Sequence, residues 1–109
     1  MTANGDTLLE KLDALQSRFA EVATLITDPA VIADQPRYVR LTKEYKELED
    51  LMAARKEYAA LLRNLDESKT LLVTESDPEL KEMAREEVAS CEARLPQLEE
   101  EIKLMLVSK

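Results

Sequence analysis

A chain of 109 residues, 45% of them hydrophobic and 35% charged, is long enough for one small domain at most. Its net charge is −8, and it has one glycine and no histidine, which removes the usual general base, the commonest metal ligand and a glycine-rich phosphate loop. Cys91 is the single cysteine, so no internal disulfide can form, and no apolar run approaches the roughly 18 residues of a membrane span. We therefore expect a cytoplasmic, non-enzymatic protein without cofactor or metal.

The first apolar stripe predicts a helix from about residue 7 to residue 27. Asp6 or Thr7 can begin it, and Glu10 stands three residues after Thr7, the spacing of a capping box. Neither proline nor glycine interrupts it. Its apolar residues recur at spacings of four, three, four, three and four: Leu8, Leu12, Leu15, Phe19, Val22 and Ile26. This heptad spacing indicates a narrow seam that faces partner helices.

A proline-bounded turn precedes a second, much longer helix. Asp28-Pro29 stops the first helix because proline forces its predecessor out of the α region. Asp34 can cap the next helix, with Pro36 tolerated in its first turn. The second helix is predicted over residues 36–74, roughly 55 Å at 1.5 Å per residue. Its stripe contains Tyr38, Leu41, Tyr45, Leu48, Leu51, Met52, Tyr58, Leu61, Leu62, Leu65 and Leu72, with the polar Arg55 at one seam position.

A second break precedes a third helix, predicted over residues 78–107. Ser76 and Asp77 each offer an N-terminal cap, one residue apart. Pro96 lies inside the stripe, where it removes a backbone donor and crowds the carbonyl of Glu92. The helix therefore either kinks there or is two helices end to end. One face carries Leu80, Ala84, Val88, Cys91, Leu95, Leu98, Ile102 and Met105.

Two long helices joined by a turn of three or four residues must lie antiparallel. The first helix supplies a third apolar stripe, so the smallest packing solution is a long antiparallel hairpin with a shorter helix packed on it. The sequence therefore predicts an all-α, coiled-coil-like fold of three helices, with residues 1–109 forming a single domain.

Few residues in this pattern suggest chemistry. The glutamates at 99–101 are interpreted as a solvated face, with Glu99 pairing Lys103 four residues on. Cys91 lies on the apolar stripe, which favours a buried, unreactive thiol. The tyrosines of the second helix are interpreted as packing residues with hydroxyls in water: Tyr38, Tyr45 and Tyr58.

Positive charge gathers on the second helix. Residues 1–35 carry two basic and six acidic groups, residues 36–74 eight and seven, and residues 75–109 five and ten. A basic strip, spaced by three residues, consists of Arg37, Arg40, Lys43 and Lys46. It can contact phosphate, or it can be a solvated strip balanced by Glu44 and Glu47.

The run LITDPAVIADQPRYVRLTKEYKEL, residues 25–48, resembles the N-terminal domain of the bacterial peptide chain release factor 1 family. In that domain a first helix ends near an Asp-Pro, and an isoleucine-and-aspartate turn follows. A segment of the type Tyr/Phe-x-x-Leu-x-Lys/Arg-Glu-Tyr then opens the second helix. The matching residues are Asp28, Pro29, Ile32, Ala33, Asp34, Tyr38, Leu41, Lys43, Glu44 and Tyr45. The run DPELKEMAREE, residues 77–87, is similar to the start of the family's third helix, although Pro96 departs from its pattern.

This resemblance implies a role in translation termination on the bacterial ribosome. In the family, one domain reads UAA and UAG stop codons with a Pro-x-Thr tripeptide, and another triggers peptidyl-tRNA hydrolysis with Gly-Gly-Gln. Neither tripeptide occurs here, so we expect the first domain of a longer factor, without termination activity of its own. The resemblance implies docking near the stalk base of the large subunit, with ribosomal protein and RNA as partners. The basic strip would lie nearest the RNA.

Two other classes remain open at this point. An unrelated acidic coiled-coil adaptor or prefoldin-like chaperone subunit would share the heptads and the acidity, although it needs neither Asp-Pro break. A basic hairpin that binds RNA by itself is the third possibility, and its affinity would fall steeply with salt. The reading frame beyond Lys109 distinguishes the release factor from these alternatives, because a downstream Gly-Gly-Gln is expected only for the release factor.

Overall fold

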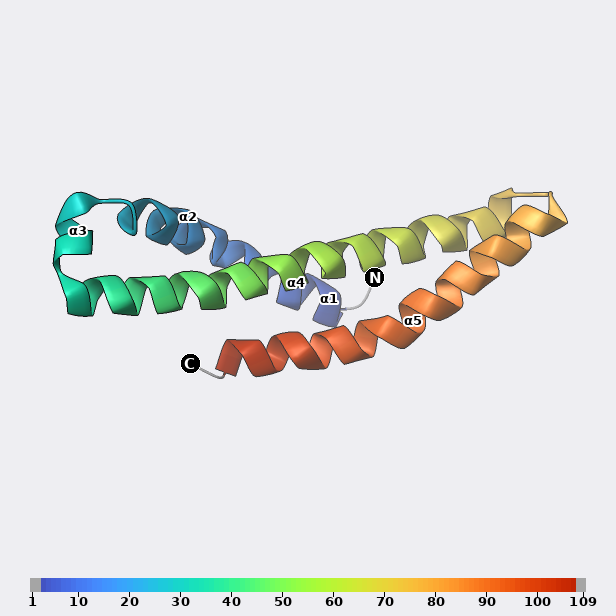
Figure 1. The fold of residues 1–109 in the computed structure, drawn as a ribbon. Helices are drawn as coiled ribbons and strands as arrows, with labels where there is room; N and C mark the ends of the chain where they lie inside the picture. Colours follow the sequence, from blue (N-terminus) through green and yellow to red (C-terminus); the bar gives the residue numbers. More distant parts are fainter. Residues whose placement is uncertain (1–2, 108–109) are drawn as a thin grey trace. The chain divides into compact units, whose positions relative to one another are not determined.

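The structure, a computed structural model, describes residues 3–107, with side chains from residue 7 onward (Figure 1). This part of the chain forms five helices and no strand: α1 (Ala3–Ala14), α2 (Gln16–Leu25), α3 (Pro29–Ala33), α4 (Gln35–Thr74) and α5 (Pro78–Val107). The predicted all-α fold class is thereby confirmed. The chain divides into two compact units, residues 1–55 (unit 1) and 56–109 (unit 2), and α4 contributes to both. The assignment of residues 1–109 to one domain stays a prediction.

In unit 1, α1 and α2 run antiparallel to the first half of α4. Arg18 pairs with Glu44, while Asp13, earlier in the chain, pairs with Arg55, later in the chain. Arg55, the polar residue predicted in the seam, is half-buried in that ion pair. Figure 1 shows α3 at the end where the chain turns from α2 into α4. The buried side chains of unit 1 are Leu8, Leu12, Val22, Val31, Leu41, Leu48, Leu51 and Ala54.

The single helix predicted over residues 7–27 differs from the structure and requires correction. The helix begins at Ala3, so Thr7 lies inside it rather than at its cap, and it is interrupted at Leu15. There the Leu15 N–H donates to the Leu12 carbonyl, three residues back, at 3.1 Å. A step of this tighter geometry rotates the following residues by about 20°, the angle by which an α-helix lags behind a heptad repeat. The turn therefore keeps the heptad seam on one side of two short helices.

The proline-bounded turn contains a short helix, α3, that the sequence pattern does not predict. Asp28 caps α3, because its Oδ1 accepts a hydrogen bond from the Ala30 N–H at 2.9 Å. Val31 within α3 is buried, with 1% exposed surface, and closes the core of unit 1. Asp34 caps α4 as predicted, accepting from the Arg37 N–H at 3.3 Å. The turn is thus a packed element that fixes where α4 begins.

In unit 2, α5 returns antiparallel to the second half of α4, and the predicted helical hairpin is confirmed. Its ion pairs and hydrogen bonds join later residues of α4 to earlier residues of α5: Tyr58 to Glu99, and Lys69 to Glu92. The hairpin buries Tyr58, Ser68, Ala84, Cys91, Leu95, Leu98 and Ile102. Leu80, predicted in this stripe, lies in the first turn of α5 and is 44% exposed.

The third helix begins and continues in ways that the sequence left open. Asp77 provides the cap, with its Oδ1 accepting from the Glu79 N–H at 2.9 Å. Pro96 lies within a continuous helix, which curves along its length (Figure 1). Both Pro96 and Glu92 are on the exposed side of α5. Water can therefore reach the carbonyl that lacks its usual donor, and the helix bends around its buried face instead of breaking.

Candidate functional site

All four residues of the basic strip are exposed on the first turns of α4. Among the described residues, Arg37, Arg40 and Lys43 make no ion pair. Lys46 lies 3.2 Å from Asp50 Oδ1 and 3.6 Å from Glu49 Oε1. These carboxylates raise the pKa of Lys46, chiefly through the hydrogen bond that Lys46 donates to Asp50. The strip therefore has three uncompensated cations and one whose charge is already balanced locally.

Helix geometry sets the direction in which these cations point. Residues three apart on an α-helix differ by about 60° around its axis, so the strip covers roughly half of the circumference. Leu41 and Leu48 on the same segment are buried, which defines the inner side. Arg37 begins beside that inner side and Lys46 lies nearly opposite it. Val39, 59% exposed, lies within the same outer surface.

Glu44, expected to balance the strip, is engaged elsewhere. Its two carboxylate oxygens accept from Arg18 on α2, at 2.6 Å from Nε and 2.7 Å from Nη2. Arg18 also donates to Glu21 at 2.8 Å. The hydrogen bonds that Arg18 donates, first to Glu44 and then to Glu21, raise the pKa of its guanidinium. Because this bidentate pair joins two helices, Glu44 serves the packing of unit 1 rather than the neutralisation of neighbouring cations.

An aromatic pair holds the same part of α4 in place. The rings of Phe19 on α2 and Tyr45 on α4 are stacked, with centroids 5.2 Å apart and planes inclined by 23°. They stand one residue after Arg18 and Glu44 on their respective helices. Stacking and ion pair together fix the rotation of α4, which keeps the strip turned toward solvent.

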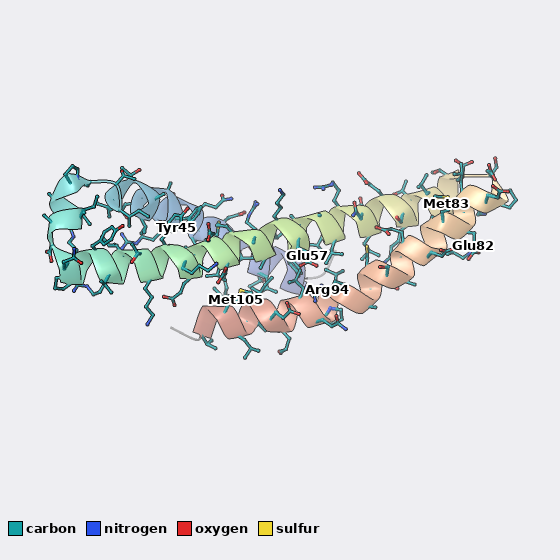
Figure 2. All side chains as sticks on the ribbon, in the orientation of Figure 1. Tyr45, Glu57, Glu82, Met83, Arg94 and Met105 are labelled. Atoms are coloured by element: carbon teal, nitrogen blue, oxygen red, sulfur yellow. The ribbon has the colours of Figure 1, made fainter. Side chains whose placement is uncertain are left out.

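A second polar cluster joins the two helices of unit 2, with Glu57 on α4 facing Arg94 on α5 (Figure 2). Arg94 donates to Glu57 at 2.8 and 3.1 Å, and to Glu101 at 2.8 and 3.3 Å. The hydrogen bond from Arg94 holds the pKa of Glu57 below its usual value. Tyr58, fully buried, donates its hydroxyl to Glu99 at 2.7 Å.

This cluster corrects two expectations from the sequence. Glu99 was expected to pair Lys103, but its carboxylate accepts from Tyr58 on the facing helix. The Tyr58 hydroxyl was expected in water, but the side chain has 0% exposed surface. Both errors have one cause, because the sequence gives the face of each helix but not the rotation that brings the two faces into register. A buried tyrosine requires a partner for its hydroxyl.

Cys91 and the acidic side chains are the remaining candidates for chemistry within residues 7–107. Cys91 is buried as predicted, and burial, followed by the nearby Glu87, raises the pKa of its thiol. No three acidic or cysteine side chains in this part of the chain come together as a metal site would require. None of the described helices combines the length and apolarity needed to cross a bilayer.

An all-helical scaffold that presents a cationic strip is typical of interaction domains. The family model described as the PCRF domain matches residues 15–109. The chain therefore belongs to the PCRF-domain family, and the resemblance to the N-terminal domain of the release factor 1 family is confirmed. The match gives no support to the adaptor or chaperone alternative.

Several relatives named peptide chain release factor 1 are similar to this chain. The protein from Bacteroides thetaiotaomicron is 65% identical over 105 residues, covering 96% of this chain and 28% of that protein. The protein from Parabacteroides distasonis is 60% identical over 102 residues, covering 94% and 28%. The chain thus spans less than a third of the length of these relatives. No solved structure matches it.

Proposed function

We propose that this chain is the first domain of a class I peptide chain release factor that directs termination at UAA and UAG codons. The observation that carries the proposal is the identity of 65% over nearly the whole chain to a protein named peptide chain release factor 1. The domain itself acts as a ribosome-docking module in the cytoplasm, and it performs no chemistry. Codon reading and peptidyl-tRNA hydrolysis belong to the domains that follow it in the longer protein.

The basic strip is the side of the domain nearest ribosomal RNA at the stalk base. Arg37, Arg40 and Lys43 support this proposal because they are exposed and uncompensated in an otherwise acidic chain. Lys46 contributes less, because Asp50 and Glu49 already balance its charge. The acidic surfaces of the chain turn away from phosphate or toward basic ribosomal protein.

The test replaces three cations of the strip, R37Q/R40Q/K43Q, in the full-length factor. Termination rate is measured against factor concentration at two salt levels. We expect a higher KM with an unchanged kcat, because the strip is remote from the chemistry and contributes only to binding. Loss of three phosphate contacts makes the salt dependence shallower: the negative slope of log affinity against log salt decreases in magnitude by roughly 2 to 3.

A matched control removes the same charge elsewhere. Lys11, Lys56 and Arg63 are exposed and make no ion pair among the described residues, so K11Q/K56Q/R63Q changes the net charge equally. If the strip docks on RNA, KM rises in R37Q/R40Q/K43Q and stays at the wild-type value in K11Q/K56Q/R63Q. Equal KM values for the two variants would contradict the proposal and would mean that the strip is only a solvated helix face.

A further inference from the structure

The last turns of α5 are apolar on both faces of the helix. Ile102 is fully buried in the core of unit 2, and Met105 and Leu106 are half-buried. Leu104 and Val107 point away from that core, with 64% and 78% of their surfaces exposed. Figure 2 marks this end of α5 by Met105. From residue 102 to residue 107, Lys103 is the one polar residue.

A helix that is hydrophobic all round is normally covered on all sides. The preceding turn of α5 is different, because its exposed surface carries the charged residues Glu100 and Glu101. The change from a charged to an apolar outer face therefore occurs at Leu104. We define the outer apolar face as Leu104 and Val107, which lie three residues apart and so adjoin on the helix surface.

We propose that this outer apolar face is the docking site for the polypeptide that follows residue 109 in the full-length factor. The inference rests on the proposed function, which makes this chain the first part of a longer protein. The relatives are more than three times as long as the matched region, so such a segment has ample length. It is also tethered within two residues of Val107, which gives it a high effective concentration at this face.

The experiment measures amide hydrogen exchange at residues 104–107 in the 109-residue chain and in the full-length factor. We expect exchange to be at least about tenfold slower in the full-length factor, because docking opposes local opening of the last helical turn. L104Q/V107Q in the full-length factor is expected to remove that excess protection. Slower exchange that survives this double substitution would come from continuation of the helix alone, and it would overturn the proposal.

The control substitutes two exposed apolar residues on either side of the turn that joins α4 to α5, Val73 at the end of α4 and Met83 near the start of α5. Val73 and Met83 are 86% and 64% exposed, and the length of α5 between its ends is roughly 45 Å. V73Q/M83Q should leave the protection at residues 104–107 intact, and its loss in this variant would contradict a local docking site.

Peptide release at a UAA codon is measured on the same samples. Release without excess protection refutes the docking and leaves the proposed function standing. Excess protection without release refutes the function alone. A reading frame that ends at Lys109 refutes both.

Discussion

The hydroxyl of Tyr58 offers the sharpest test of how α4 and α5 are held in register. Tyr58→Phe keeps the fully buried ring and removes the donor to the Glu99 carboxylate, 2.7 Å away. A hydrogen bond to a charged group contributes about 1.5 to 3 kcal/mol. Glu99 is half-exposed and can regain water, so we expect a loss near the lower limit, about 1.5 kcal/mol.

The assay is urea unfolding and thermal unfolding of the 109-residue chain, each followed by far-ultraviolet circular dichroism. For a chain of this size the expected loss lowers Tm by roughly 6 to 12 °C. Tyr45→Phe is the matched control, because Tyr45 is half-buried and its hydroxyl makes no hydrogen bond among the described residues. The Tyr45→Phe substitution should lower the free energy of unfolding by less than about 0.5 kcal/mol.

A double-mutant cycle with Glu99→Ala isolates the pair itself. The coupling free energy should be about 1 kcal/mol, since the two residues touch and act together. Tyr58→Phe that destabilises no more than Tyr45→Phe, or a coupling near zero, would refute this account of the register between the helices.

Other consequences can be measured on the same chain. Arg94→Gln should destabilise the fold only slightly at neutral pH, because the carboxylates that it pairs with are partly exposed. The pKa of Glu57 is lowered in the folded state, so the stability it contributes is present above its unfolded pKa of about 4.3 and is lost as pH falls further. Urea unfolding across this range should therefore show a weaker acid dependence in R94Q than in the wild type, and parallel curves would contradict the pairing. Cys91 should react slowly with a disulfide reagent at mildly alkaline pH and rapidly in urea, because burial raises the pKa of its thiol. Equal rates would show that the thiol is accessible. The isolated chain should release no peptide from ribosomes stalled at UAA or UAG, and release above a blank would contradict its role as a docking module.

The sequence predicted most accurately the elements whose limits depend on local chemistry. The predicted helices over 36–74 and 78–107 differ from α4 and α5 by at most one residue at their ends. Asp34 and Asp77 cap these helices with short side chains that bond to nearby amides, so their role can be inferred from adjacent residues. The break at Leu15 lacks such a signal, because neither glycine nor proline marks it.

The candidate site was predictable in position but not in its partners. The spacing of Arg37, Arg40 and Lys43 indicated an exposed strip, and each is exposed. The sequence could not show that Arg18, 26 residues before Glu44, would take the carboxylate expected to balance it. Such pairings depend on the rotation of packed helices, to which residues distant in sequence contribute.

The central claim is that this domain contributes binding and not chemistry to termination. The most direct measurement compares the full-length factor with the same protein lacking residues 1–109, in peptide release at a UAA codon over a range of factor concentrations. The account predicts that KM rises at least about tenfold, because a tethered docking module is lost, while kcat stays within about twofold. An unchanged KM, or a kcat that collapses at saturating factor, would contradict it.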